Sequence, residues 1–151
     1  LLMLGSSLDK SQRIKYTAVS LILWFMLFIG SIISVVMYLT SGLVQTVSLQ
    51  LEAIQQGNPE KAYSYTSKDF QSSTSLDEFK IIIDKHPSLK NNASTSFYER
   101  SINNNIGSLR GTLTSVDGGQ TPVEYILIYE NGGWKIYKFN IDPKSGMDAK
   151  D

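Results

Sequence analysis

Few side chains of this sequence could carry out chemistry. The sequence contains one histidine, His86, and no cysteine. Without cysteine there is no disulfide, thiolate metal site or cysteine nucleophile. A lone histidine does not indicate a Ser-His-Asp arrangement, and no glycine-rich phosphate loop follows a predicted strand. The sequence therefore predicts no cofactor and no metal site, and it leaves open only acid–base chemistry by an isolated side chain.

Asp69 and His86 are the two candidates for a general base. Asp69 follows a predicted helix, where its side chain could point toward the mouth of a pocket, but Lys68 and Gln71 beside it indicate solvent. His86 comes at the end of another predicted helix, directly before Pro87, and a helix-terminal role is the simpler interpretation. No pair of carboxylates has a spacing that would drive two pKa values apart. An enzyme is therefore the least favoured of three hypotheses.

The longest signal is an uncharged run between Lys15 and Glu52. Its first part, residues 16–40, is uncharged and mainly apolar, and a helix of this length crosses a hydrocarbon core of about 30 Å. Tyr16 and Tyr38 lie near its ends, where interfacial aromatic residues are common. The apolar core is longer than that of a cleaved signal peptide. We therefore predict a single transmembrane helix that acts as an uncleaved signal anchor and places the protein in a lipid bilayer.

The charges around this span predict its orientation. Lys10, Arg13 and Lys15 precede it, whereas the first basic residue after it is Lys61. The positive-inside rule then places residues 1–15 in the cytoplasm and the rest outside, on the periplasmic side of a bacterial inner membrane. The segment after the span is slightly acidic and has no basic patch, so nucleic acid is not an expected partner.

Two small residues of the span could contact another helix. Gly30 and Ser34 form a small-xxx-small pair, which allows a neighbouring helix to approach closely. We predict that they pack on integral membrane protein subunits. Because small residues are frequent in membrane helices, a chance occurrence is the alternative.

The sequence after the span predicts helices and then strands. Residues 41–56 have an amphipathic pattern with a joint at Ser41-Gly42, in which the polar residues, Gln50 among them, lie away from the apolar face. Gly57-Asn58-Pro59 predicts a second helix over 59–67. A capping box formed by Ser75 and Glu78 begins a third helix over 76–85, with Phe79, Ile82 and Ile83 buried.

Period-two patterns predict four antiparallel strands. They cover residues 94–102, 107–116, 123–130 and 134–141, and the last two form a hairpin at Asn131-Gly132. The short connections favour antiparallel pairing. We expect one domain over 41–142 and a flexible tail over 143–151.

The last two predicted strands are apolar on both faces. Strict alternation places Trp134 and Ile136 opposite to Tyr137, Phe139 and Ile141. A sheet with one solvated face would alternate apolar and polar residues, so both faces should be covered. Cover could come from helices, from a second copy in a homodimer through the sheet, or from a partner protein. The candidate interface residues are Ile126, Ile128, Trp134 and Ile136.

Residues 51–141 resemble the nuclear transport factor 2-like superfamily, in particular its small, membrane-anchored extracytoplasmic members. The matching segments are AIQQGNPEKAYSYTSKDFQ, SLDEFKIII and ENGGWKIYKFNI. The resemblance implies an α+β fold: one N-terminal transmembrane helix, then a cone-shaped domain of about three helices on a bent antiparallel sheet of about four strands. Enzymes of this superfamily place a catalytic Asp or His inside the cone. The layout is also similar to an inner-membrane component of type IV secretion systems and to cytochrome oxidase assembly factors.

The favoured hypothesis is a non-catalytic, membrane-anchored accessory, assembly or stabilising subunit of a respiratory, photosynthetic or secretory membrane complex. The alternative is a tethered domain whose cone binds a small hydrophobic ligand, because several of the 8 tyrosines fall in predicted strands.

Overall fold

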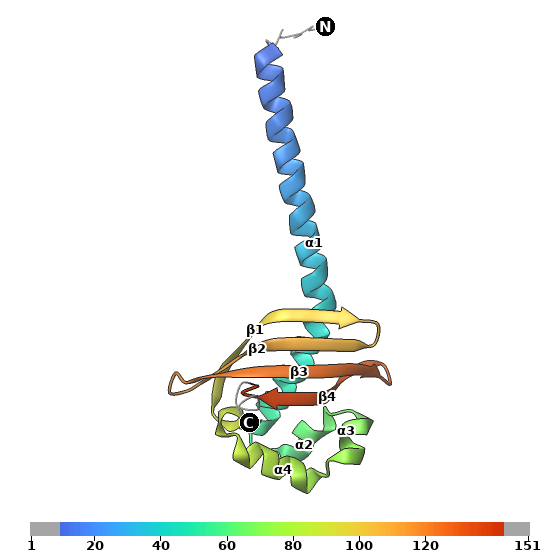
Figure 1. Cartoon of the computed structure of the whole chain (residues 1–151), viewed down its shortest axis with the longest axis vertical. Coiled ribbons are helices and arrows are strands. Elements are labelled where there is room, and N and C mark those ends of the chain that lie inside the picture. Colours follow the sequence, from blue (N-terminus) through green and yellow to red (C-terminus); the bar gives the residue numbers. More distant parts are fainter. Residues whose placement is uncertain (1–9, 144–151) are drawn as a thin grey trace, which may run out of the picture. The chain divides into compact units, whose positions relative to one another are not determined.

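The computed structural model describes residues 10–143 and has the predicted α+β fold (Figure 1). Its helices are α1 Lys10–Gln55, α2 Pro59–Ser64, α3 Lys68–Ser73, α4 Leu76–Lys85 and α5 Pro87–Lys90. Its strands are β1 Asn92–Asn103, β2 Ile106–Ser115, β3 Gln120–Glu130 and β4 Gly133–Ile141. The chain forms two compact units, the first ending at Leu39 and the second beginning at Thr40. Residues 1–9 of the predicted N-terminal segment and 144–151 of the predicted tail lie outside the described residues.

The predicted joint at Ser41-Gly42 does not interrupt α1, so this prediction is wrong. The helix continues through Gly42, and the Thr46 hydroxyl donates to the Gly42 carbonyl at 3.0 Å. One glycine costs a helix only about 1 kcal/mol, which the flanking apolar residues offset when they pack. The helix ends where it was expected, with Gly57 in the left-handed conformation at φ 70°.

The part of α1 from Thr40 to Gln55 forms part of the domain core. Leu43, Val47, Leu51 and Ile54 are buried, as the amphipathic pattern predicts. Gln50 was expected on the polar side, but it is only 1% exposed. It follows Val47 by three residues and therefore shares its helical face. Its side-chain amide donates to the Ala62 carbonyl at 3.4 Å, which reduces the cost of burial.

The helix predicted over 59–67 is shorter than expected, and a separate helix, α3, follows it from Lys68. Helix α2 stops at Ser64 because the chain then pairs with β4: the Ile136 amide donates to the Tyr65 carbonyl, and the Ser67 amide donates to the Ile136 carbonyl, both at 2.9 Å. Ser67 also begins α3, since its hydroxyl accepts the Phe70 amide at 3.1 Å. This second cap positions α3 against the start of the sheet's last strand.

Helix α4 matches its prediction residue for residue. The Ser75 hydroxyl accepts the Glu78 amide at 3.3 Å, and the Glu78 carboxylate accepts the Ser75 amide at 2.7 Å. The Ser75 amide and, at 2.9 Å, the Ser75 hydroxyl donate to the Glu78 carboxylate, and these two bonds lower the pKa of this carboxyl. The predicted helical stripe packs inward, with Phe79 and Ile83 buried and Ile82 half-buried.

The four strands form one antiparallel sheet in the order β1-β2-β3-β4, as predicted. Figure 1 shows the bent sheet crossing the C-terminal end of α1, with α2, α3 and α4 grouped beside β4. Alternating residues of β2 and β3 face the helices, and Leu109, Leu113, Tyr125 and Leu127 are almost completely buried. The core therefore lies between one face of the sheet and the helices.

A β-bulge in β4 changes which residues face this core. Ile126 pairs with Lys138 and Leu127 pairs with Ile136, so Tyr137 is an extra residue. The extra residue returns Phe139 and Ile141 to the face that Ile136 occupies. The prediction that Ile136 opposes them is wrong, because strict alternation cannot register a bulge.

Candidate functional site

Aromatic rings pack against one another in the interior between the helices and the sheet. Phe70 of α3, Phe79 of α4 and Phe139 of β4 contact one another with ring centroids 5.9 to 6.3 Å apart. Tyr125 stacks on Phe139 at 5.9 Å and meets Phe97 edge-on at 6.3 Å. Such stacked and edge-to-face pairs are favourable packing for a protein interior. The chain's own side chains therefore occupy the centre of the domain.

Tyr125 is a buried residue of this interior whose polar group has no partner. Its side chain is 1% exposed, and its hydroxyl is the only buried side-chain polar atom without a hydrogen-bond partner among the described residues. Burial raises the pKa of this phenol. An unsatisfied buried hydroxyl costs about 1–3 kcal/mol. The alternation of β3 predicted the burial of the ring, but no sequence signal indicated the missing partner.

A cleft of about 420 Å³ opens at the edge of this cluster. Its apolar lining comes from Phe70, Ile82 and Phe139. Its polar lining comes from Asp69, Ser73, Thr74, Tyr137 and Lys138. The volume falls within the range of small-molecule sites. Sequence reasoning placed only Asp69 near such a mouth; the bulge that brings Tyr137 and Lys138 to it left no recognisable pattern.

The two candidate general bases are not brought together in this cleft. Asp69 is exposed on its lining, whereas His86 is not one of its lining residues. The Nδ1 atom of His86 lies 3.0 Å from the Ile82 carbonyl, one turn back at the end of α4. This contact fits the helix-terminal interpretation of His86. Within residues 10–143, no three His, Asp or Glu side chains gather as metal ligands would.

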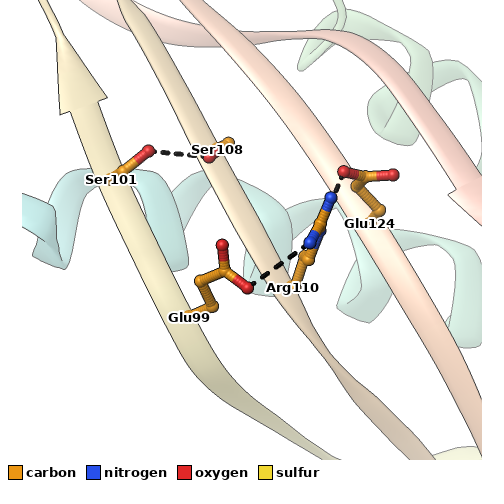
Figure 2. Close-up of polar contacts among 5 residues, drawn as sticks. All are labelled: Glu99, Ser101, Ser108, Arg110 and Glu124. Carbon is orange, nitrogen blue, oxygen red and sulfur yellow. Dashed lines mark hydrogen bonds and ion pairs between the residues drawn. The ribbon is translucent and has the colours of Figure 1, made fainter.

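The outer face of the sheet, turned away from the helices, has a polar ladder at its centre (Figure 2). Arg110 of β2 donates from Nε to the Glu124 carboxylate at 3.0 Å, and its Nη1 lies 3.6 Å from a Glu99 oxygen. Next to it, the hydroxyls of Ser101 and Ser108 are 2.8 Å apart. The hydrogen bond to Glu124, together with both carboxylates, raises the pKa of Arg110. The outer face therefore carries charged and hydroxyl side chains on β1 and β2, beside the apolar residues predicted for β3.

Three isoleucines give the outer face its apolar part. Ile106 pairs with Ile128 across β2 and β3, and Ile126 lies two residues before Ile128. Ile106 is 50% exposed, and the other two are half-buried. Lys135 and Lys138 pair with Ile128 and Ile126 on the neighbouring strand. Of the predicted interface, Ile126 and Ile128 therefore lie on this outer face.

Trp134 and Ile136 lie on the other face of the sheet. Ile136 is fully buried, so its assignment to a partner interface is wrong. Trp134 is half-buried, packs on the core and contacts Tyr129 with ring centroids 5.3 Å apart. The bulge at Tyr137 is the reason, since it puts both residues on the same face as Phe139.

The first unit offers a different kind of surface. One helix is long and apolar enough to cross a membrane, and it begins at Lys10 near the N-terminus. Its large apolar side chains are exposed, from Ile14 to Leu39. The Ser34 hydroxyl donates to the Gly30 carbonyl at 2.8 Å, which satisfies it within the helix. Apart from Ile29, Ser31 and the helix's own nearby backbone, no described atom lies within 4 Å of the place where a Gly30 Cβ would stand.

Comparison with known proteins identifies the fold. The sequence model of a family described as a domain of unknown function, DUF4864, matches residues 39–149. No protein among the curated sequences matches. Similar solved structures include a candidate NTF2-like transpeptidase from Campylobacter jejuni (10% identity, TM-score 0.50, covering 62% of this chain and 96% of that one). Another is an NTF-2 like protein of unknown function from Shewanella oneidensis (17% identity, TM-score 0.50, covering 68% and 97%). At these identities the similarity establishes an NTF2-like fold and nothing about activity.

Proposed function

The chain belongs to the DUF4864 family, and from its apolar helix and its filled domain we propose that it is a non-catalytic, single-pass accessory subunit of a larger membrane protein complex. It would assemble or stabilise that complex, which could be respiratory, photosynthetic or secretory. The observation that carries the proposal is the exposed apolar surface of α1 before Thr40.

This surface needs lipid or protein to cover it. Apolar side chains surround the helix on all sides, which suits a membrane span and not a helix in water. Lys10, Arg13 and Lys15 before it, with no basic residue after it until Lys61, support a cytoplasmic N-terminus and an extracytoplasmic domain, periplasmic in a bacterium.

The open space beside Gly30, here called the notch, supports a helical partner in the membrane. Gly30 has no side chain, so the helix backbone is accessible there. The Ser34 hydroxyl, one turn further on, donates to the Gly30 carbonyl, so it presents no unpaired polar group to lipid. Helices associate in membranes through such close backbone packing, because apolar side chains gain little from leaving lipid tails. The partner would be an integral membrane subunit.

The domain supports binding to proteins more than chemistry. Its interior is packed with aromatic rings, and Asp69 and His86 are not combined in one cleft. Its outer face instead offers Ile106, Ile126 and Ile128 beside the Arg110 ladder. A mixture of apolar centre and polar surroundings is typical of protein interfaces. A second copy of the chain on this face is the alternative occupant.

The proposal is tested with a pair of variants in the span. Gly30→Ile fills the notch, and Ser31→Ile makes a comparable change about 100° round the helix. Each full-length chain, tagged at its C-terminus and expressed at native level, is purified in mild detergent and its partners are quantified by mass spectrometry. We expect Gly30→Ile to lose membrane subunits that the wild type and Ser31→Ile retain. Equal recovery from all three chains would argue against packing at Gly30.

The cleft supports a second candidate function, the binding of a small hydrophobic ligand. Phe70, Ile82 and Phe139 offer an apolar surface, with Asp69 and Lys138 to orient a polar group. The ligand would occupy the mouth, because the aromatic cluster fills the interior. Native mass spectrometry of the full chain would reveal a bound small molecule that Ile82→Asp removes; an unliganded mass under all conditions would exclude this function.

A further inference from the structure

The β1–β2 hairpin carries an uncharged tip, of which the proposed protein interface uses only Ile106. From Ser101 to Leu109 the sequence reads SINNNIGSL, with no charged residue between Arg100 and Arg110. Ile102 is 37% exposed and Ile106 is 50% exposed. Ile102 pairs with Gly107 on the core side of the sheet, and Ile106 pairs with Asn103 on its outer side. The two isoleucines therefore lie on either side of one polar turn.

This tip is held against the start of the domain's own helix. A Cβ added to Gly107 would lie only 2.4 Å from a methyl carbon of Leu43, so the β2 backbone packs directly on that side chain. On the neighbouring face of α1, the Trp134 ring would lie 3.0 Å from a Cβ at Gly42. Thr46 adds a hydrogen bond to the Trp134 carbonyl at 3.4 Å. Both hairpin ends at this side of the sheet thus contact α1 at its first turns within the domain.

Chain length then restricts where the tip can be. Leu43 follows the predicted end of the span, residue 40, by three residues, which bridge at most about 10 Å even when fully extended. The interfacial layer outside the hydrocarbon core is about 5–8 Å thick on each side of a bilayer. Whatever angle the domain adopts on its anchor, Leu43 and the backbone packed on it stay beside this layer.

We propose that the β1–β2 hairpin rests on the membrane, with Ile102 and Ile106 inserted among the lipid headgroups of the bilayer that α1 crosses. The inference rests on the proposed span. An uncharged tip fits the membrane–water interface because no charge has to be desolvated. Trp134 and Tyr129 lie beside the tip, and tryptophan and tyrosine are the aromatic residues that are enriched at this interface. Such a contact would fix the domain's orientation toward the proteins that it accompanies.

The absence of cysteine from the sequence makes single labelled positions available for the test. Ile102→Cys and Ile106→Cys, each carrying an environment-sensitive fluorophore, are placed as full chains in nanodiscs of phosphatidylcholine and phosphatidylglycerol. Quenching is measured with nitroxide lipids labelled at the headgroup or deep in the acyl chain. Ile81→Cys is the matched control: it is an isoleucine that is 53% exposed on α4, next to Lys80, which lines a cavity with Ile54. Ile54 is about 16 Å further along α1 than Leu43.

We expect headgroup nitroxides to quench both hairpin positions more strongly than Ile81, with a blue shift of their emission. Quenching at either hairpin position no stronger than at Ile81 overturns the inference. Leu27→Cys, in the middle of the span, separates the two proposals. If deep nitroxides quench Leu27 while the hairpin stays unquenched, only the hairpin contact fails; if Leu27 is not quenched, the span itself fails. Both hairpin substitutions replace exposed side chains, so the fold is retained, which thermal unfolding confirms for each variant.

Discussion

The two parts of α1 share one continuous backbone but face different surroundings. Before Thr40, large apolar side chains are exposed on every side of the helix. After it, Leu43, Val47, Leu51 and Ile54 are buried on one face, and the exposed positions are mostly polar: Gln45, Ser48, Glu52 and Gln55. Secondary structure alone therefore says little about what a helix does. The side-chain pattern shows which part is apolar enough to cross a membrane and which part completes a protein core.

The difference between the two parts of α1 is tested most strongly by truncating one leucine to alanine in each part. Leu43 is fully buried and Leu39 is 59% exposed. We expect Leu43→Ala to lower the free energy of unfolding of the domain by about 2–5 kcal/mol, because it leaves a cavity. Leu39→Ala should change it by less than about 0.5 kcal/mol. Denaturant unfolding of the full chains in nanodiscs, followed by near-ultraviolet circular dichroism, measures both; equal losses would contradict the division of α1.

The contact between α1 and β2 can be examined through Gly107. Gly107→Ala places a methyl group against Leu43 in a packed interior, and we expect it to cost about 1–3 kcal/mol. If the collision with Leu43 is the cause, the double variant Gly107→Ala/Leu43→Ala should lose less stability than the sum of the two single variants. Strict additivity in the same unfolding assay would mean that the two residues do not contact each other.

The buried Tyr125 should make the stability of the domain depend on pH, whereas an exposed tyrosine should not. In the folded domain its pKa is raised by burial, whereas in the unfolded chain it titrates near 10. Stability is therefore unaffected by this group below pH 10 and is lost above it, by at most about 1.4 kcal/mol per pH unit. Tyr125→Phe should remove this loss, and near pH 7 it should be neutral or stabilising by about 1 kcal/mol, since the hydroxyl has no partner.

The control for Tyr125 is Tyr98→Phe, a change at a side chain that is 72% exposed. It should leave the difference between the stabilities at pH 9 and pH 11 as in the wild type. A wild-type difference that Tyr125→Phe does not reduce would show that the phenol is hydrated or hydrogen-bonded.

The smallest expected effect belongs to the outer face of the sheet. Arg110 lies between Glu99 and Glu124 on an exposed ladder, where ion pairs are weak and screened by salt. We expect Arg110→Gln to leave the melting temperature in high salt almost unchanged. If this face binds a partner, the same variant should weaken co-purification of that partner, which separates a binding role from a structural one. A large drop in melting temperature would instead make the ladder a structural element.

Where the sequence predicted the fold well, the signals were local. Ser75 and Glu78 specify the start of α4 through their own hydrogen bonds, and the alternation of Val123, Tyr125 and Leu127 identifies the core face of β3. The resemblance through SLDEFKIII and ENGGWKIYKFNI pointed to the NTF2-like fold that the solved structures share.

The failures came from interactions between distant segments. The pairing of Tyr65 and Ser67 with Ile136 ends α2 early, and the partner is roughly seventy residues away, beyond any local pattern. The bulge at Tyr137 reverses the expected facing of Ile136, because one extra residue exchanges the two faces of a strand. Of the candidate site, Asp69 was placed from the sequence, but the cleft lining of Phe70, Lys138 and Phe139 depends on this distant pairing.

The central claim is that the chain functions as a subunit of a larger membrane complex. The most direct measurement is native-gel separation of gently solubilised membranes, with quantitative mass spectrometry of the fraction that contains the full chain. We predict that the chain migrates with a fixed, stoichiometric set of integral membrane proteins. Migration as a lone monomer or homodimer, with no membrane protein in constant ratio, would contradict the account.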